Sequence, residues 1–327
     1  MRVVILDDYQ DCVRHLDCFA ALASHEVTIW NDTAADPDQL VERLCAAQAV
    51  VLIRERTRIT PALLDRLPNL RMISQTGKVA PHIDLLACTQ RGILVTEGNG
   101  TAAATAELTW ALMLASRRHL VTEVNRLRGG AWQSTLGQQL FGQRLGVWSY
   151  GRIGQQVARY GRAFGMRVWV WGRQASITQA SADGFDVAPS REAFFEQSDV
   201  VSLHLRLNEE TRSMVQAADL ARMKPSALLV NTSRAELIAP HALEQALRRG
   251  RPGFAAVDVF ETEPVVGAQH PLLNLPNALC TPHLGYVEKD NYERYFGIAF
   301  ENINQFAAGC PTGVVNPEAL AATAKGV

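Results

Sequence analysis

Short apolar runs that alternate with segments of helical pattern restrict the fold of this chain most strongly. Such alternation is typical of βαβ units, in which helices connect parallel strands. Runs such as VWVW and ALLV are apolar at every position, as expected for a sheet covered on both faces. The sequence therefore predicts an α/β protein with doubly wound parallel sheets. The expected strands are 3–6, 27–30, 49–53, 70–74 and 93–95, followed by 145–149, 168–171, 199–203, 227–231, 255–259 and 279–281.

The expected strands fall into two sets, separated by the glycine-rich segment 97–100, a candidate hinge. A chain of 327 residues suits two lobes of about 150 residues better than one core. A strong helical pattern begins at Ala106, and HALEQALRRG ends in arginines and Gly250, which favour a helix stop. The helical segment 289–308 has no strand after it, so we expect it to return to the first lobe.

Composition excludes several classes of protein. Hydrophobic residues make up 47% and charged residues 20%, the balance of a folded chain rather than a disordered one. The net charge of -1 and the lack of a basic stripe argue against a nucleic-acid partner. No polybasic or lipidation signal indicates a membrane partner, and the first residues, MRVVILDD, read as a strand rather than a signal peptide. We expect a cytoplasmic protein.

The six cysteines are scattered and lack the spacing of a zinc or redox motif. We therefore expect reduced, mostly buried thiols and no metal site. The residues are Cys12, Cys18, Cys45, Cys88, Cys280 and Cys310.

The segment 145–154, LGVWSYGRIG, reads as a strand, a tight turn and a helix start. In dinucleotide-binding turns, glycines let the backbone approach the pyrophosphate, which lies at the helix N-terminus. The second and third glycines of that fingerprint are present, but Ser149 replaces the first. The preceding strand and following helix still favour a cofactor turn over a plain β–α turn. Its candidate residues are Gly151, Arg152, Ile153 and Gly154.

The next strand, VWVW, leads into Gly172-Arg173-Gln174, where an acid would normally bind the adenosine ribose. Loss of that acid removes repulsion against a 2′-phosphate, and Arg173 is able to pair with one. NADP is therefore favoured over NAD, with Arg173 and Gln174 as cofactor residues. The alternative is that Arg173 stacks on adenine or points to solvent.

Three later segments carry polar side chains just beyond expected strands: LLVNTSRAELI with Arg234, AAVDVFETEP with Asp258 and Glu263, and LCTPHLGY with His283. Parallel α/β sheets place their ligand crevice at this strand edge. These motifs, with VSLHLRLNEET, stand in the order of the D-isomer-specific 2-hydroxyacid dehydrogenase family, which the chain resembles over nearly its whole length. The resemblance implies a Rossmann nucleotide lobe at 102–286. It also implies a flavodoxin-like substrate (catalytic) lobe formed by 1–101 and 287–327.

The resemblance implies an oxidoreductase that transfers a hydride between NAD(P)H and a small 2-keto or D-2-hydroxy acid. His283 is the expected proton donor, because an imidazole titrates near working pH. Glu263 would orient His283 and stabilise its imidazolium form. Arg234 would bind the substrate carboxylate and polarise the carbonyl group. Taken singly, each of the three is more typical of a surface pair, a solvated acid or a core histidine; their order as a set favours catalysis.

The same resemblance implies that Asp258 accepts from the nicotinamide carboxamide and that Thr232 and His204 lie along the cofactor. In the first lobe, QTGKVAPHIDL replaces the usual glycine-rich substrate loop. Its backbone amides at Gly77, Lys78 and Val79 would bind the substrate carboxylate. Lys78 either reads an additional anionic group or is a solvated loop lysine, and Arg54 is a candidate for the substrate mouth.

Three positions depart from the family pattern: Ser149, Ala235 where glycine is common, and Arg206 where proline is usual. The charge of Arg206 favours NADP. One alternative function is a dinucleotide-sensing, corepressor-like regulator on the same fold without turnover, which the absence of long extensions disfavours. A formate-type dehydrogenase is disfavoured because that branch has glutamine where Glu263 stands. The resemblance also implies a homodimer built through helices of the nucleotide lobe.

Overall fold

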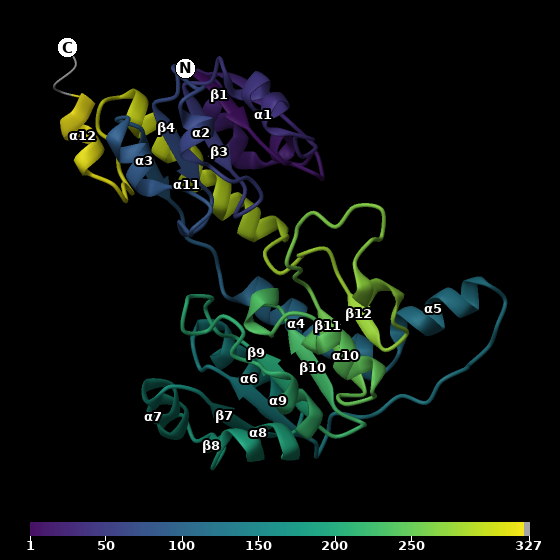
Figure 1. The fold of residues 1–327 in the computed structure, drawn as a ribbon. Helices are drawn as coiled ribbons and strands as arrows, with labels where there is room; N and C mark the ends of the chain where they lie inside the picture. The colour runs from purple at the N-terminus through teal and green to yellow at the C-terminus, as the bar shows by residue number, and fades with distance from the viewer. Residues whose placement is uncertain (324–327) are drawn as a thin grey trace. The chain divides into compact units, whose positions relative to one another are not determined.

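The computed structural model describes residues 1–323, and the chain divides into two compact units (Figure 1). Unit 1 comprises Met1–Gly100 together with the segment that begins at Glu288, and unit 2 comprises Thr101–Val287. Each unit is built around its own parallel sheet, so the predicted α/β fold with two doubly wound sheets is confirmed. Residues 324–327, the end of the expected substrate lobe, lie outside the described residues.

The sheet of unit 1 has the strand order β2-β1-β3-β4-β5, the flavodoxin-like order, and its strands are parallel. All four residues of β3 and of β4 are buried, as expected for strands with helices on both faces. The five predicted runs all form strands, shifted by no more than two residues. The strands are β1 (Arg2–Ile5), β2 (Glu26–Ile29), β3 (Ala49–Leu52), β4 (Met72–Gln75) and β5 (Leu94–Glu97).

The long helix α11 (Lys289–Ala307) joins unit 1, as predicted for this segment. Its Ala299 carbonyl accepts a hydrogen bond from Ser74 on β4 at 3.0 Å, and its Phe300 packs edge-on against Phe19. The other helices of unit 1 are α1 (Pro37–Leu44), α2 (Pro61–Leu64), α3 (Leu85–Gln90), α12 (Glu318–Thr323) and the 3₁₀ helices η1 (Val13–His15) and η2 (Asp17–Leu22).

The sheet of unit 2 has the order β12-β11-β10-β9-β6-β7-β8. Neighbouring residues of one strand enter opposite cores: Leu229 packs with α8, α9 and α10, whereas Leu228 and Val230 pack with α4 and α6. The sequence prediction missed β8, whose two residues include the exposed Asp186. The strands are β6 (Arg144–Trp148), β7 (Arg167–Trp171), β8 (Asp186–Val187), β9 (Val200–Leu203), β10 (Leu228–Asn231), β11 (Phe254–Val257) and β12 (Ala278–Cys280).

The strong helical pattern that begins at Ala106 forms one helix in the structure, α4, within three residues of the predicted segment 106–120. Helix α4 ends at Arg117, because His119 adopts a left-handed conformation (φ 52°), and α5 then begins at Leu120. The helices of unit 2 are α4 (Ala103–Arg117), α5 (Leu120–Arg128), α6 (Arg152–Ala163), α7 (Gln174–Ala182), α8 (Arg191–Gln197), α9 (Ala217–Arg222), α10 (Ala242–Arg248), η3 (Ala235–Leu237) and η4 (Pro271–Asn274).

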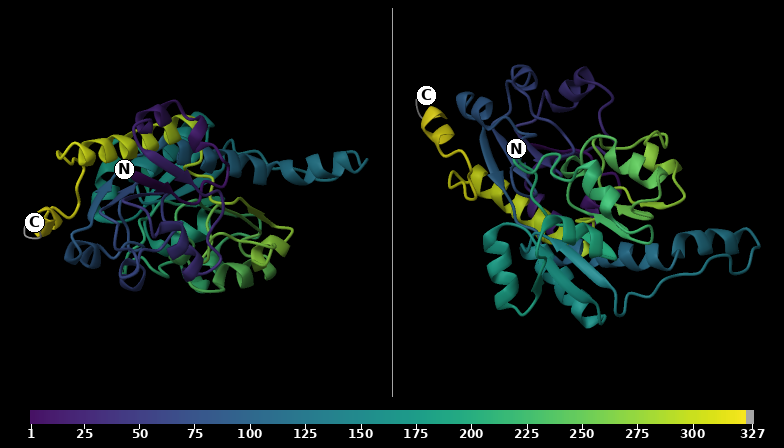
Figure 2. Two further views of the ribbon diagram at one scale, coloured as in Figure 1. Left: turned by 90° about the horizontal axis from the view of Figure 1, so that it is seen from above. Right: turned by 60° about the horizontal axis from the view of Figure 1, so that its bottom comes forward.

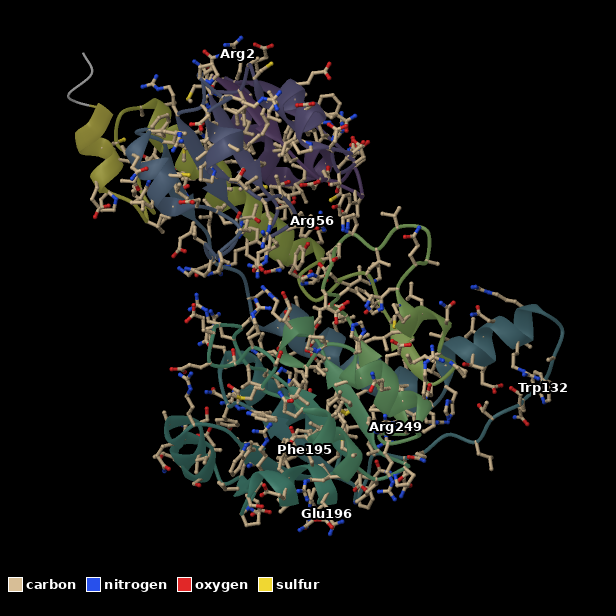
Figure 3. All side chains as sticks on the ribbon, in the orientation of Figure 1. Arg2, Arg56, Trp132, Phe195, Glu196 and Arg249 are labelled. Atoms are coloured by element: carbon tan, nitrogen blue, oxygen red, sulfur yellow. The ribbon has the colours of Figure 1, made fainter. Side chains whose placement is uncertain are left out.

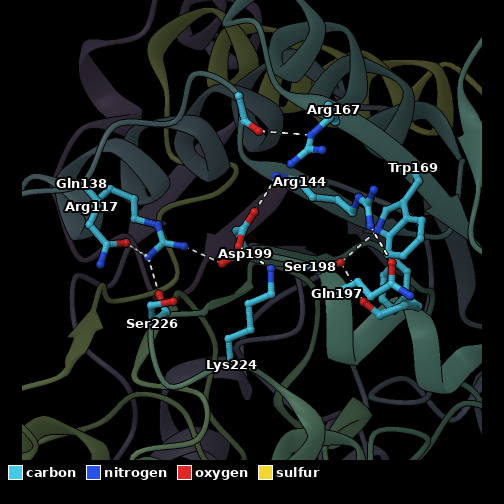
Figure 4. Close-up of polar contacts among 12 residues, drawn as sticks. Arg117, Gln138, Arg144, Arg167, Trp169, Gln197, Ser198, Asp199, Lys224 and Ser226 are labelled. Atoms are coloured by element: carbon cyan, nitrogen blue, oxygen red, sulfur yellow. Dashed lines mark hydrogen bonds and ion pairs between the residues drawn. The ribbon is translucent and has the colours of Figure 1, made fainter.

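A polar cluster around Asp199 ties together the amino ends of the central strands of unit 2 (Figure 4). The Asp199 carboxylate accepts from the Arg144 amide at 2.7 Å and pairs with Lys224 at 2.6 Å. The buried Arg117 guanidinium donates to the Asp199 carbonyl and, at 2.6 Å, to the Ser226 carbonyl. Burial lowers the pKa of Arg117 to about 10. This cluster aligns the amino ends of β6, β9 and β10. The carboxyl ends of these strands, which the candidate site residues follow, are therefore also fixed relative to one another.

Helix α5 and the segment after it project from the sheet of unit 2 (Figure 2). None of the residues of α5 is buried. Trp132, labelled in Figure 3, has 76% of its surface exposed, which is unusual for so large an apolar side chain. The exposed large apolar residues of this projection, called the arm below, are Leu120, Val121, Val124, Leu127, Trp132, Leu136 and Phe141.

Two further expectations concern the whole chain. All six cysteines are free thiols, but the expectation that most are buried is wrong: only Cys88 is fully buried, and Cys45 and Cys310 are exposed. Among the described residues, no helix combines the length and apolarity that crossing a bilayer requires, and no three His, Cys, Asp or Glu side chains cluster as metal ligands would.

Candidate active site

Three adjacent strands of unit 2 end at the candidate catalytic residues. Arg234 follows β10, Glu263 lies beyond β11, and His283 lies beyond β12, and these strands are neighbours in the sheet. Because the strands are parallel, their carboxyl ends share one edge. Residues separated by up to 49 positions in the sequence, from Arg234 to His283, are thus attached to one edge.

His283 and Glu263 form a direct pair: His283 Nδ1 lies 2.6 Å from Glu263 Oε2. The other oxygen, Oε1, accepts from the Phe260 amide at 2.9 Å, which fixes the plane of the carboxylate. With Nδ1 engaged, Nε2 is the ring nitrogen left for proton exchange. The His283 backbone has φ 53°, a conformation that L residues adopt rarely and that functional sites often contain.

The turn that carries His283 is fastened by the buried carboxylate of Asp258. Its Oδ1 accepts from Thr281 Oγ1 at 2.6 Å and from the Leu284 amide at 2.7 Å, and its Oδ2 accepts from the Gly285 amide at 2.8 Å. Burial raises the pKa of Asp258, although these hydrogen bonds and the charge of His283 act in the opposite direction. Asp258 therefore anchors residues on both sides of His283, a contact that the sequence did not reveal.

Arg234 is held through its backbone carbonyl and through its guanidinium group. Its carbonyl accepts from Asn231 Nδ2 at 2.8 Å, and its guanidinium Nη1 lies 2.6 Å from the Ser233 carbonyl. Ser233 is itself bound to the Leu203 carbonyl on β9 at 2.8 Å. The buried Asn231 and the half-buried Ser233 thus fix the peptide from which Arg234 extends.

The candidate phosphate turn joins β6 to α6. A Cβ atom at Gly154 would lie 2.2 Å from the Ser149 carbonyl oxygen, so only glycine allows this close contact between helix and strand. A Cβ atom at Gly151 would meet nothing within 4 Å, which leaves an open face beside the first turn of α6. Gly151 is the N-cap and supplies no side-chain cap, while Arg152 and Ile153 begin the helix. The N-terminus of α6 is the place where dinucleotide-binding turns hold the pyrophosphate.

Gly172 and Arg173 follow β7, next to the phosphate turn. A Cβ atom at Gly172 would lie 3.5 Å from Ser149 Cα, so the two turns pack closely. Arg173 is 70% exposed and pairs with the equally exposed Glu210 at 2.6 Å. Gln174, the first residue of α7, is exposed, and its Nε2 lies 3.4 Å from Thr178 Oγ1.

His204 and Thr232 lie at the ends of β9 and β10. His204 Nε2 is 2.9 Å from Ser202 Oγ, and its buried Nδ1 has no hydrogen-bond partner among the described residues. Burial lowers the pKa of His204 to about 3, so the ring is neutral. Thr232 Oγ1 is buried and bonded to Thr109 Oγ1 at 2.7 Å. A buried, unpartnered ring nitrogen beside the open turn fits a bound dinucleotide.

Unit 1 brings together the candidate substrate residues of its own strand ends. Arg54, which follows β3, extends across Gly77: a Cβ atom at Gly77 would lie 1.9 Å from Arg54 Nη1. Arg54 Nη1 also lies 3.3 Å from the hydroxyl of Tyr295 on α11. Tyr295 was not predicted, because nothing in the sequence indicates that the C-terminal helix contacts this loop. The Arg54 guanidinium thus occupies the space that a side chain at position 77 would take.

The other two loop candidates share an unpredicted partner, Glu97 at the end of β5. Glu97 Oε1 lies 2.5 Å from Lys78 Nζ, and Glu97 Oε2 accepts from the Val79 amide at 3.0 Å. The Lys78 side chain is 61% exposed and forms an ion pair within the protein. The parallel register, which places Glu97 opposite Gln75, explains the proximity.

Comparisons with known proteins show the family of this chain. The family model described as "D-isomer specific 2-hydroxyacid dehydrogenase, NAD binding domain" matches residues 110–285, more than half of the chain. The chain belongs to the D-isomer-specific 2-hydroxyacid dehydrogenase family. A glyoxylate reductase from Aeropyrum pernix is 35% identical over 90% of this chain and 91% of its own length.

Solved structures of relatives are also close. A phosphoglycerate oxidoreductase from Vibrio cholerae is 50% identical with a TM-score of 0.93, covering 94% of this chain and 99% of its own. The D-lactate dehydrogenase of Aquifex aeolicus, solved with NAD and lactic acid, is 26% identical with a TM-score of 0.77, covering 96% and 99%. The chain is thus an oxidoreductase that uses a nicotinamide dinucleotide, as predicted.

Proposed function

We propose that this dehydrogenase reduces small 2-keto acids to D-2-hydroxy acids, with Arg234, Glu263 and His283 as its catalytic residues. The observation that carries the proposal is the 2.6 Å pair of His283 and Glu263 on a turn anchored by Asp258. The names of relatives, which include glyoxylate reductase and hydroxypyruvate reductase, support a small 2-keto acid as substrate.

The chemistry divides among the residues by their types. When bound, the nicotinamide supplies the hydride. His283 donates the proton to the carbonyl oxygen through Nε2, and Glu263 stabilises the imidazolium form and keeps Nδ1 engaged. Arg234 binds the carboxylate with its planar, fork-shaped set of donors and polarises the carbonyl group.

Unit 1 supplies the second group of substrate contacts in this proposal. The amides at Gly77, Lys78 and Val79 bind the substrate carboxylate, and Arg54 adds a guanidinium beside Gly77. Unit 2 supplies the cofactor contacts: the turn Gly151–Gly154 for the pyrophosphate, and His204, Thr232 and Asp258 along the nicotinamide half. Asp258 uses three of its roughly four acceptor positions within the chain, which leaves one for the carboxamide.

We propose NADP as the preferred cofactor. Gly172 puts no carboxylate where the adenosine ribose is expected, and Arg173 and Arg206 add positive charge there. Glu210 neutralises Arg173 through an exposed pair, which costs little to break. A 2′-phosphate would replace the Glu210 carboxylate on the same guanidinium, with Gln174 beside it as a further donor.

A kinetic panel tests the proposed reaction. Purified protein is assayed with glyoxylate, hydroxypyruvate, pyruvate and phosphohydroxypyruvate, each with NADH and NADPH. We expect turnover of at least one acid, lost in Arg234→Ala. The absence of turnover across a broad panel would favour a dinucleotide-sensing regulator, and full activity of Arg234→Ala would refute the assigned mechanism.

We further propose a homodimer formed through the arm. A monomer rarely exposes so many large apolar side chains on one projection, and a second copy of unit 2 would cover them. Light scattering after gel filtration should give twice the mass of 35.9 kDa. The double variant Val124→Glu, Leu127→Glu should shift it toward the monomer mass. A monomeric wild-type protein would refute the proposal.

We also propose a cytoplasmic location, which the six free cysteines support, since such thiols persist in a reducing compartment. Fractionation of the native cells tests it. Recovery of the enzyme outside the cytoplasmic fraction would contradict it.

A further inference from the structure

The substrate loop of unit 1 already holds a carboxylate, and that carboxylate belongs to the protein. The Val79 amide donates to Glu97 Oε2 at 3.0 Å, and Lys78 Nζ lies 2.5 Å from Glu97 Oε1. We call the Val79 amide and the Lys78 ammonium the anion cradle. The proposed function assigns the Val79 amide to the substrate carboxylate, and the Lys78 ammonium adds a positive charge beside that amide. Glu97 thus occupies, with both of its oxygens, positions that a substrate anion would need.

The backbone of Glu97 is fixed on both sides. Its strand pairs with β4, its amide donates to the Gly313 carbonyl at 3.1 Å, and the next amide, of Gly98, donates to the Gly77 carbonyl at 3.0 Å. A Cβ atom at Gly98 would lie 2.8 Å from the Thr76 carbonyl oxygen, so strand and loop are in close contact. The carboxylate can therefore leave the cradle only by rotation of its side chain.

Of the two paired side chains, Lys78 is the more exposed and has more freedom to move. The Lys78 side chain is 61% exposed, whereas that of Glu97 is 22% exposed. The Coulombic part of such a partly exposed pair is weak, and a competing anion can replace it at small cost. The Val79 amide is part of the backbone and keeps its place, so it can bind either Glu97 or a substrate, but not both with the same proton.

We infer that Glu97 is an internal competitor of the substrate carboxylate, and that it sets the KM for anionic 2-keto acids. The inference rests on the proposed function, because it deepens the role of the same loop. Glu97 repels an incoming anion and neutralises Lys78 until it is displaced. An uncharged substrate, such as the methyl ester of the acid, meets no such charge repulsion. Glu97 therefore lowers the preference of the enzyme for the acid over its ester.

The substitution Glu97→Gln tests the inference, because glutamine keeps the size and one acceptor oxygen but loses the charge. We expect the KM for the best 2-keto acid to fall roughly fivefold, the effect of removing one partly exposed charge interaction. The kcat should stay within about twofold, since the change affects binding before the chemical step. The ratio of kcat/KM for the acid to that for its methyl ester should rise. Glu42→Gln, an exposed acid on α1, is the matched control and should change none of these values.

A double-mutant cycle with Lys78→Met adds a second readout. In the wild type, Glu97 already neutralises Lys78, so the loss of Lys78 should raise the KM only slightly. In the Glu97→Gln background Lys78 is available to the substrate, and its loss should raise the KM more. Equal effects of Lys78→Met in both backgrounds would contradict competition.

Binding of oxamate, measured by calorimetry on the full chain, separates this inference from the proposed function. If no 2-keto acid is turned over, the proposed function fails, yet tighter oxamate binding by Glu97→Gln than by wild type would still support the cradle. If the wild type is active and Glu97→Gln leaves the KM and the oxamate affinity unchanged or weaker, Glu97 is a structural residue and the inference is overturned.

Discussion

A Cβ atom at Gly154 would lie 2.2 Å from the carbonyl oxygen of Ser149, so the third glycine of the fingerprint is a packing requirement. We predict that Gly154→Ala destabilises the protein by about 2 kcal/mol, because the clash is with backbone and exceeds the gain in helix propensity. Urea unfolding measures the loss. Gly151→Ala is the control: its Cβ has open space, so stability should hold while dinucleotide affinity falls. Equal stability of Gly154→Ala and wild type would contradict the packing argument.

Ser149 itself has φ 79°, a left-handed conformation that costs an L residue free energy. Ser149→Gly, which restores the fingerprint, should therefore stabilise the protein by about 0.5 kcal/mol after the added entropy of the unfolded chain is subtracted. Chemical denaturation of the variant and the wild type shows whether the free energy of unfolding rises or falls. A clear loss of stability would show that the serine side chain contributes more than its backbone costs.

The pairing of Glu263 with His283 predicts a loss of turnover. We expect Glu263→Gln to lower kcat about 10- to 100-fold and His283→Ala about 10²- to 10⁴-fold, the usual range for acid–base groups. Steady-state kinetics measure both. Glu261→Gln is a matched control, because this neighbouring acid pairs with His270 instead and should leave kcat nearly unchanged. Comparable losses in the control and in Glu263→Gln would indicate a general loop effect.

The cluster around Asp199 predicts a pH dependence of stability. Burial raises the pKa of Asp199, but the Arg144 amide and the Lys224 ammonium outweigh it, so the folded pKa lies below the ordinary value of 3.8. The carboxylate therefore contributes stability above about pH 4, and that contribution is lost as pH falls through the folded pKa. The Asp199→Asn variant should have a free energy of unfolding about 2 kcal/mol lower than wild type at pH 7. Its free energy of unfolding should also fall less steeply as the pH is lowered. An unchanged acid profile in urea melts would contradict this.

The exposed pair of Arg173 and Glu210 gives a test of cofactor choice. Arg173→Ala should weaken NADPH binding about tenfold and leave NADH binding nearly unchanged, because only NADPH carries the 2′-phosphate. Glu210→Gln should strengthen NADPH binding, since it frees the guanidinium. Fluorescence titration measures each affinity. If Arg173→Ala affects the two cofactors equally, Arg173 contacts a part that they share.

Much of the fold was predictable because the strands of covered parallel sheets are apolar throughout. Within residues 1–323, all eleven predicted strands are present and β8 alone was missed, since two residues with one exposed side chain leave no apolar run. The helical pattern over 106–120 forms α4, with its ends shifted by three residues. Helix α5, none of whose residues is buried, was not predicted.

The sequence by itself determined where the strands lie along the chain and which motifs follow them, from Arg234 to His283. Local hydrophobicity and turn residues are enough to locate these features. Only the tertiary structure decided which side chains meet. It set Glu97 against Lys78, Tyr295 against Arg54, and Asp258 against the turn of His283. These contacts join segments from 19 to 241 residues apart. They arise from strand register and from the return of α11 to unit 1, which no local pattern encodes.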